Sequence, residues 1–422
     1  MMLKKLRNSF SHVPLLSWLL GALIAVVLEY YLGDALADVL RLPKIPVLFG
    51  FVIMLKKPLL IPSALVFVSL IYALPISVVA RLSASITNRL VAWLFKFPTI
   101  ISVVIHIGFL YAILHLWSDV SAYRVLTLKL TMIAIMVTLS LNVVNGYMGE
   151  FSCSHPGFMA LGAYAASVFT VLFFAKDKLF GPAILPEALG PYMFPIALII
   201  GGLVAALGAL AIAIPSFRTR GDYLAIISLA FMFIVKSMIE NLEVVGGPRG
   251  LSSQPDYANL PTVFLWTVAC VWIINNFVRS TMGKALNAVR DDEMAANAMT
   301  VNTRKTKIVA FLFAAFWAGV AGGLFAHVLR YVNPGTFGLQ KLAEVLAMVY
   351  FGGLNSVYGS IVGAVSLSMI SEALRPLEIF KWIIIPLLLI LVMIYRPTGL
   401  VAFKEFDVKK LIKPKHKQEK EV

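Results

Sequence analysis

The stretch that decides the fold is IVAFLFAAFWAGVAGGLFAHVL, residues 308–329. It contains no lysine, arginine, aspartate or glutamate, and its only ionisable side chain is His327. A helix of about 20 consecutive apolar residues spans the hydrocarbon core of a bilayer. The stretch therefore predicts a membrane-spanning helix, which we extend to residue 332.

Apolar runs of similar length recur on both sides of this stretch. The further candidate spans are 13–32, 58–80, 90–117, 124–144, 156–175, 193–214, 222–240, 262–278, 342–355, 357–373 and 380–396. The run 342–355 is short, so its crossing is left open, and the run 45–55 is expected at the membrane interface. We expect an all-α polytopic integral membrane protein with about 10–12 transmembrane helices, some of them short or interrupted.

The composition excludes a soluble globular protein. Of the 422 residues, 60% are hydrophobic and 14% are charged, whereas soluble domains are nearer half apolar and a quarter charged. The mean hydropathy is +0.89. The two cysteines, Cys153 and Cys270, have no CxxC spacing. We therefore expect neither a metal site nor a disulfide framework.

The net charge of +15 is concentrated in short loops and at both ends of the chain, which is the positive-inside pattern rather than that of a nucleic-acid-binding protein. Anionic membrane lipids are the expected partner. With Lys4, Lys5 and Arg7 inside, the loop 279–307 and the tail after Phe403 also lie inside. Both termini are therefore expected in the cytoplasm. The cations that come out external are Lys56, Lys57, Lys176 and Lys178.

The first apolar run, 13–32, is longer than the roughly 7–15 residues of a cleavable signal. We expect a retained signal-anchor helix, although Ala35-Leu36-Ala37 would suit a signal peptidase. Residues 1–120 form an N-terminal transmembrane extension with little glycine patterning. Residues 121–402 form the main transmembrane domain, and residues 403–422 a cytoplasmic Lys/Glu-rich tail.

Two glycine-rich breaks punctuate the main domain, at Gly146–Gly162 and Gly352–Gly363. Glycines in corresponding apolar segments can mark interrupted helices that line a transport pathway. Small residues also allow two helices to pack closely. The sequence leaves both interpretations open.

The loop 279–307 is long for a connection between spans and is expected to contain two short helices. The first covers about Lys284–Arg290, and the second opens at Asp291 or Asp292, because aspartate is a good N-cap. Glu293 in the first turn suits the helix dipole. The second helix presents a small-residue surface made by Ala295, Ala296, Ala298 and Met299. Such a loop is either a docking element for another protein or a solvated connector.

Six further blocks occur in a recognisable order. They are Leu141–Gly149, His155–Tyr164, Arg218–Ile227, Gly246–Leu251, Gly352–Gly359 and Arg396–Leu400. Together with Glu293-Met294-Ala295-Ala296 in the loop, they resemble the permeases of branched-chain amino acid (LIV-type) ABC importers, in particular the high-affinity M-type permease subunit. The resemblance covers residues 125–402.

This resemblance implies a permease subunit in the bacterial cytoplasmic (inner) membrane and no enzymatic activity. A periplasmic binding protein would deliver the substrate to a pair of permease subunits, and separate ABC ATPases would bind ATP and magnesium. The chain has no Gly-x4-Gly-Lys-Ser/Thr phosphate loop, so no cofactor is expected in it. Branched-chain or other hydrophobic amino acids are the substrates implied. Urea, short amides and aromatic acids are the alternatives.

The resemblance also assigns residues. The loop would couple to the ATPases through Arg290, Asp292, Glu293, Ala295, Ala296 and Met299. Thr300 stands where the coupling motif usually has glycine, which allows a different turn after the second helix. Near the pathway, the family more often has Gln, Leu and Gly where this chain has Glu150, Cys153 and Ser154.

Ionisable residues within spans are candidates for translocation or gating, because a charge in hydrocarbon is costly. Together with glycines of the breaks, the candidates are His155, Gly157, Asp222, Lys236, Glu344, Gly352 and Gly353. Structural pairing is the alternative, and Lys236 has Glu240 four residues away. The lone histidines of apolar runs, His106, His115 and His327, are interpreted as satisfied core residues.

Two other classes of membrane protein, secondary carriers and membrane-embedded enzymes, fit the sequence less well. An ion-driven secondary carrier would cluster carboxylates near the membrane centre, but those of this chain mostly lie near span ends. A membrane-embedded enzyme would need a catalytic pair such as Ser/His or His/Glu, and no pair at suitable spacing occurs.

Overall fold

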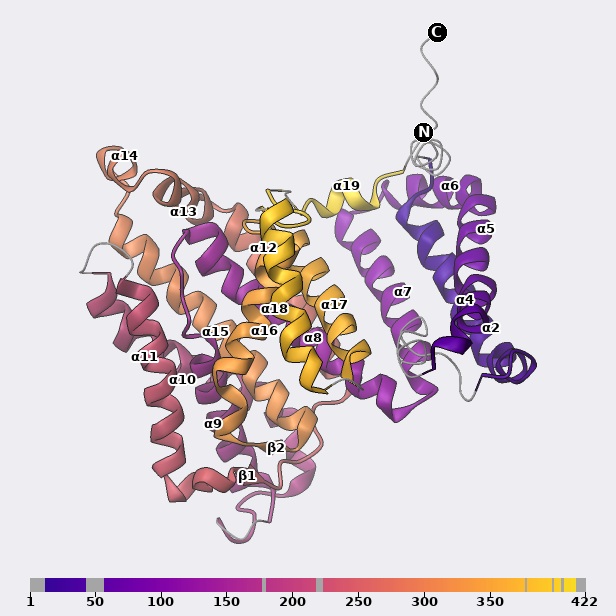
Figure 1. Cartoon of the computed structure of the whole chain (residues 1–422). Helices are drawn as coiled ribbons and strands as arrows, with labels where there is room; N and C mark the ends of the chain where they lie inside the picture. The colour runs from indigo at the N-terminus through magenta and orange to yellow at the C-terminus, as the bar shows by residue number, and fades with distance from the viewer. Residues whose placement is uncertain are drawn as a thin grey trace. The chain divides into compact units, whose positions relative to one another are not determined.

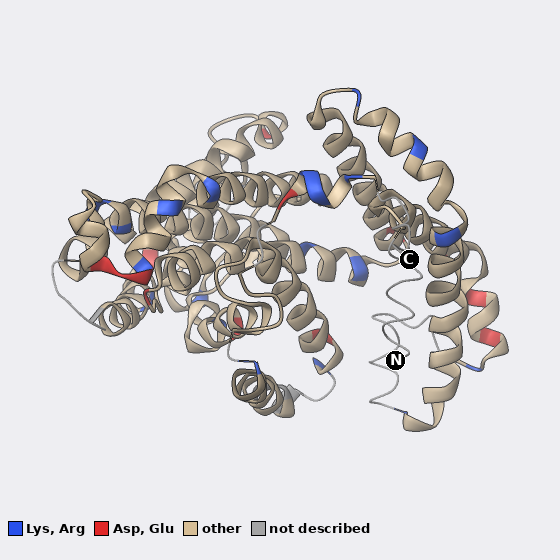
Figure 2. Cartoon of the chain, turned by 90° about the horizontal axis from the view of Figure 1, so that it is seen from above, with Lys and Arg blue, Asp and Glu red and all other residues tan. Residues whose placement is uncertain are grey.

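A computed structural model describes residues 12–42, 57–176, 180–217, 223–375, 378–396, 398–403 and 406–414. Several sequence predictions fall outside these ranges: the interfacial run 45–55, Asp222, the basic residues Lys4, Lys5 and Arg7, and the tail from residue 415. Within the described ranges the chain is almost entirely helical (Figure 1). Most of each ribbon is free of charge, and charged residues occur as short separate bands (Figure 2).

Nine helical segments among the described residues are long and apolar enough to cross a membrane. Seven are single helices: α2 (Leu15–Val39), α7 (Thr99–Asp119), α9 (His155–Phe174), α10 (Gly190–Ser216), α11 (Tyr223–Asn241), α12 (Leu260–Arg279) and α15 (Thr303–Leu329). Two contain π-helical turns: η2–α4–η3–α5 (Pro58–Leu82) and α8 with η4 (Ala122–Met148). Shorter helices are α6 (Ala84–Leu94), α16 (Leu339–Gly352), α17 (Val357–Ala373) and α18 (Glu378–Tyr395). The expected all-helical, multi-spanning fold is confirmed.

The run 90–117, expected as one span, is divided. Helix α6 ends at Leu94 and α7 begins at Thr99. Pro98 explains the division, because a proline disfavours helical backbone at the residue before it and has no N–H to donate.

The chain forms two compact units, and the boundary between them falls inside α8. The N-terminal unit comprises residues 1–127, 372–378 and 407–422. The second unit comprises residues 128–371 and 379–406. The names N-terminal unit and second unit are used for them below.

A buried ion pair lies at the centre of the N-terminal unit, where α2 packs against α5 (Leu74–Leu82) and α7. Glu29 of α2 receives two hydrogen bonds from Arg124 of α8, at 2.7 and 3.1 Å, and both side chains are 1% exposed. The Arg124 guanidinium also lies over the Trp117 ring, 5.0 Å from its centroid. Tyr72, carried by the π-helical segment η3 (Ser69–Ala73), donates to Glu29.

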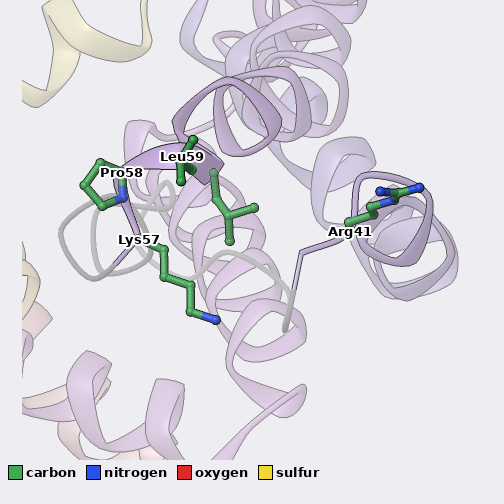
Figure 3. A pocket seen from close by; sticks show the side chains of 5 residues that line it. Arg41, Lys57, Pro58 and Leu59 are labelled. Carbon is green, nitrogen blue, oxygen red and sulfur yellow. The ribbon is translucent and has the colours of Figure 1, made fainter.

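A pocket of about 410 Å³ also belongs to the N-terminal unit (Figure 3). It is lined by Arg41, Lys57, Pro58, Leu59 and Leu60. The Arg41 and Lys57 side chains point in different directions and do not converge on a common ligand position (Figure 3). None of the residues predicted from the sequence to act in transport lines it.

The core of the second unit is formed by α9, α10 and α15, which pack against one another. Glycines lie at the contacts: a Cβ on Gly162 would overlap the backbone of Gly319, and one on Gly201 would lie 2.7 Å from the Gly162 carbonyl oxygen. Close packing by small residues therefore accounts for this part of the glycine pattern.

The two ends of the second unit differ. Helices α13 (Thr281–Asp291) and α14 (Glu293–Ala298) project at one end, and a short antiparallel pair, β1 (Leu251–Ser252) with β2 (Tyr331–Val332), lies at the other (Figure 1). This separation follows from the chain order, because α12 runs from the β1 end to α13 and α15 returns to β2.

Candidate functional site

The loop between α12 and α15 contains the two helices expected from the sequence. The Asp292 carboxylate accepts hydrogen bonds from the backbone N–H groups of Met294 and Ala295, at 2.9 and 3.0 Å. The predicted N-cap of the second helix is therefore confirmed. The first helix begins at Thr281, earlier than expected, because the Ser280 hydroxyl caps it.

Thr300 ends α14 in the conformation that glycine favours. Its φ is +65°, in the left-handed region. The N–H groups of Thr300 and Val301 donate to the carbonyls of Asn297 and Ala296, both at 3.1 Å, which closes a Schellman turn. The turn is therefore the one that glycine would make, and the β-branched threonine adopts it at a conformational cost.

Helix α14 exposes apolar side chains at the end of the bundle. Met294 is 83% exposed and Met299 is 77% exposed, while Ala296 is buried beneath them. Glu293, Ala295 and Asp292 are also exposed. Of the six loop residues predicted to act in coupling, Ala296 is buried, and Arg290 and Glu293 contact residues outside the two loop helices.

The first break in the bundle lies directly under this loop. Helix α8 continues into the π-helical η4 (Val143–Met148), and residues 149–154 are not helical; we call residues 143–154 the first break. Arg290 donates to the Gly146 carbonyl at 3.4 Å. Gly149 has φ +75°, and a Cβ there would overlap the Arg290 side chain. Glycine is thus required both by the turn and by the contact.

A second contact joins the loop to the first break. The Lys307 ammonium donates to Glu293 at 2.8 Å and to Glu150 at 2.7 Å. Sequence reasoning did not select Lys307 or its link to Glu150. Its only sequence signal is its place as the last charge before the uncharged run of α15, and Glu150 is 157 positions away.

The interior of the first break is polar and buried. The Asn145 side-chain oxygen accepts from the Ser152 N–H at 3.2 Å, and the Ser152 and Ser154 hydroxyls are 2.8 Å apart. The Cys153 N–H donates to the Ser228 hydroxyl of α11 at 2.9 Å. Burial raises the pKa of the Cys153 thiol. The break is thus held by side-chain hydrogen bonds in place of helical ones.

His155 is the first residue of α9 and is completely buried. The backbone of Ser140 lies beside its ring, yet neither ring nitrogen completes a hydrogen bond within the part of the chain that the structure describes. The ring meets Phe158 edge-on, with centroids 5.7 Å apart. Gly157 follows, and a Cβ there would lie 3.3 Å from the Met232 Cα of α11.

The second break, residues 353–356, separates α16 from α17 and lies beside the first. Asn142, the last residue of α8 before the first break, binds the second break. Its side-chain nitrogen donates to the Ser356 carbonyl at 3.0 Å and to the Ser360 hydroxyl at 2.6 Å. Its side-chain oxygen accepts from the Asn355 N–H at 3.1 Å. Interrupted helices thus account for the other part of the glycine pattern.

The segment 398–403 covers the second break. The N–H groups of Leu400 and Val401 donate to the carbonyls of Phe351 and Gly352, at 3.1 and 2.9 Å, and so satisfy the end of α16. Gly353 has φ +128°, and a Cβ there would lie 2.7 Å from the Val401 backbone. Sequence blocks that are far apart in the chain therefore meet in one place.

Residues 123–394 match the family described as branched-chain amino acid transport system, permease component. The chain belongs to this permease family. It is 32% identical over 315 residues to the high-affinity branched-chain amino acid transport system permease protein LivM of Escherichia coli, covering 66% of this chain and 70% of LivM. LivM of Salmonella typhimurium gives the same identity and coverage. BraD of Pseudomonas aeruginosa is 29% identical over 150 residues, 34% of this chain and 48% of BraD. No solved structure matches.

As a permease component, the chain is a multi-pass transport subunit and not an enzyme. The matched region begins near the start of α8. Helices α2 to α7 of the permease precede it, and the breaks, the loop and α15 all lie inside it.

The two charged gating candidates that the structure describes, Lys236 and Glu344, are paired on their own helices. Lys236 lies 3.8 Å from Glu240, which confirms the predicted pair, and both are about one-third exposed. Glu344 lies 3.1 Å from Lys341. His327 is satisfied by Thr170 and by the Gly323 carbonyl, both at 2.8 Å. The candidate site therefore consists of the loop and the two breaks, with Gly353 in the second break and His155, Gly157 and Gly352 in the adjoining helix ends.

Proposed function

We propose that this permease imports branched-chain or other hydrophobic amino acids across the bacterial cytoplasmic membrane. A periplasmic binding protein delivers the substrate, and a second permease subunit completes the pathway. Separate ATPase subunits bind ATP and magnesium and dock on the 279–307 loop. The proposal is carried by the contacts of that loop with the first break, through Arg290 and Lys307.

The exposed side of α14 supports the docking role. Two large apolar side chains, Met294 and Met299, face outward at the end of the bundle. They flank the exposed Ala295, which leaves room for a close approach by another backbone. Methionine adapts well to an apolar groove because it is unbranched and flexible. The Asp292 cap keeps this short helix formed without a partner.

The two breaks support a pathway role. Non-helical backbone lines substrate sites in transporters with interrupted helices. Here both breaks meet at Asn142, and one of them ends at the buried imidazole of His155. Substrate passes beside His155 and Gly157 on one side and Gly352 and Gly353 on the other.

The sidedness follows from charge. The loop carries Arg279, Lys284, Arg290, Arg304, Lys305 and Lys307. Positive residues in loops are retained in the cytoplasm. The loop end of the second unit therefore faces the ATPases and the β1–β2 end faces the binding protein, with both termini of the chain in the cytoplasm.

Purification of the tagged permease from its native membrane in mild detergent tests the assembly. ABC ATPases and a second permease are expected to co-elute, and mass spectrometry identifies them. Elution of the permease alone, together with uptake driven by an ion gradient in liposomes, would favour a secondary carrier. Stimulation of the ATPase by leucine-loaded binding protein, compared with urea, short amides and aromatic acids, then identifies the substrate class.

Replacement of Arg290 by alanine tests the coupling role of the loop. The variant loses the contact with Gly146 and leaves the loop helices intact, so ATP hydrolysis continues while uptake falls. Uptake of radiolabelled substrate and phosphate release are measured on the same proteoliposomes. Wild-type values of both quantities in this variant and in Glu293→Ala would contradict the coupling role.

A further inference from the structure

We propose that Lys307 is a positioning residue that transmits movement of the loop to the first break, through the ionic cluster Glu293–Lys307–Glu150. The inference rests on the proposed function and assigns the transmission to Lys307 and Glu150, which lie outside the helix that docks. Lys307 touches neither the substrate nor the ATPase surface. It acts by holding one carboxylate from each side.

The geometry of the cluster is that of a bridge. One ammonium donates to two carboxylates that belong to different segments, at 2.7 and 2.8 Å. Glu293 is the first residue of α14, the helix that projects from the bundle, and Glu150 lies in the first break. Among the described residues, no other ion pair joins the loop to a break.

Lys307, at the centre of the bridge, is the least exposed member of the cluster. The Lys307 side chain is 11% exposed, whereas the side chains of Glu150 and Glu293 are 25% and 51% exposed. Ion pairs shielded from water are screened less than surface pairs. Removal of either carboxylate leaves the largely buried Lys307 ammonium short of a partner. Displacement of Glu293 with α14 is therefore followed by Lys307, and Glu150 follows Lys307.

The two carboxylates act at different points of the transport machinery. Glu150 is five positions before His155 and directly follows the left-handed turn at Gly149. Lys307 lies in the second turn of α15, which packs along α9. Arg290 holds the same break from the other side through Gly146. A shift of the loop is thus transmitted to the first break, and from there to the start of α9, through two contacts. One is the hydrogen bond from Arg290 to the Gly146 carbonyl, and the other is the ion pair of Lys307 with Glu150.

The test uses the full complex with its ATPases in proteoliposomes, and its readout is the number of substrate molecules imported per ATP hydrolysed. Lys307→Met removes the charge and keeps the length of the side chain. Lys307→Arg keeps the charge. Lys305→Met is the matched control, because Lys305 lies two residues earlier in the same helix, is exposed, and makes no ion pair with either carboxylate.

Coupling free energies between sites commonly correspond to 5–150-fold effects. We therefore expect Lys307→Met to lower the import per ATP at least about fivefold. Lys307→Arg should stay within about twofold of wild type, and Lys305→Met should match it, since the cluster is intact in both. Glu150→Gln should also lower the ratio, and combining it with Lys307→Met should add nothing, because both changes break one contact.

A merely structural role predicts another pattern. Lys307→Met would then reduce the amount of folded complex or its melting temperature and leave the import per ATP unchanged, which would overturn the inference. An equal loss in Lys305→Met would also overturn it. If Lys307→Met does not assemble, Glu150→Gln decides in the same way. A wild-type complex without ATP-driven import refutes the proposed function itself, and the inference with it.

Discussion

At Thr300 a β-branched side chain occupies a left-handed backbone position, with φ +65°. That conformation costs a non-glycine residue about 1–2 kcal/mol. Thr300→Gly is therefore expected to stabilise α14 by about 1 kcal/mol, after the greater chain entropy of glycine is subtracted. Hydrogen exchange of the α14 amides measures the change, and exchange should slow.

The matched control for Thr300→Gly is Ala298→Gly, two residues earlier and inside the helix. Glycine there should speed exchange, since it costs about 1 kcal/mol relative to alanine in a helix. Faster exchange in Thr300→Gly would show that the threonine side chain contributes a contact that outweighs its strain.

At this scale the sequence predicts what is local. The Asp292 cap could be read from the residue type and its neighbours, because a cap bonds N–H groups two and three positions away. The partners of Lys307 could not be predicted. Its positive charge favours a carboxylate, but it does not specify Glu293, 14 positions away, or Glu150, 157 positions away. The conformation of Thr300 was likewise set by the Schellman turn and not by its own preference.

Among the elements, the joint between the two breaks depends on Asn142. Its side chain makes three hydrogen bonds and is 1% exposed. Asn142→Ala leaves the Asn355 N–H without its acceptor, at about 1–3 kcal/mol, whereas the Ser356 carbonyl keeps the N–H of Ser360. We expect the melting temperature of the second unit to fall by several degrees in detergent.

Ser140→Ala is the control for Asn142→Ala, because its hydroxyl is equally buried yet bonds only within α8, to the Val137 carbonyl. It should leave the melting temperature within a degree or two. Equal losses in both variants would mean that the joint has no special role in holding the breaks together.

Cys153 offers a probe of the first break during transport. Its thiol is buried beside Met232 and Leu342, and burial raises its pKa, so a maleimide should react slowly with the resting permease. If the first break opens to pass substrate, labelling in the working complex should accelerate several-fold with ATP and loaded binding protein. A Cys270→Ser background isolates the signal, since Cys270 is buried in α12. An unchanged rate during turnover would argue against a pathway at this break.

The spans themselves were the most predictable elements, because about 20 apolar residues in sequence leave few alternatives. The interruptions were harder. Pro98 divides one expected span, and the π-helical turns at residues 69–73 and 143–148 have no sequence signature in apolar runs. The adjacency of the two glycine-rich breaks depends on Asn142, whose partners lie more than 200 positions away.

For the molecule as a whole, the ion pair between Glu29 and Arg124 joins α2 to α8, where the region that matches the permease family begins. Both side chains are 1% exposed. Glu29→Ala leaves an unpaired buried guanidinium and should destabilise the N-terminal unit by about 3–5 kcal/mol. Thermal unfolding of purified protein measures it.

Lys236→Met provides the comparison with Glu29→Ala, since the pair of Lys236 with Glu240 is about one-third exposed and should be worth at most about 1 kcal/mol. The double variant Glu29→Leu/Arg124→Leu should recover much of the loss, because no charge is then left unpaired. A double variant as unstable as Glu29→Ala would show that the loss of stability comes from packing and not from the unpaired charge.

The ion pair between Glu29 and Arg124 can form only after a delay during biosynthesis. Arg124 is made 95 residues after Glu29, which at 5–20 residues per second is about 5 to 20 s. During that interval the Glu29 carboxyl group of α2 has no partner, because Arg124 has not yet been synthesised. Helices α4 to α7 emerge meanwhile, so α2 must be held near the site of insertion until α8 arrives. The N-terminal unit is therefore complete only after α8 has been synthesised. A chain that has not yet reached α8 is an intermediate of membrane insertion.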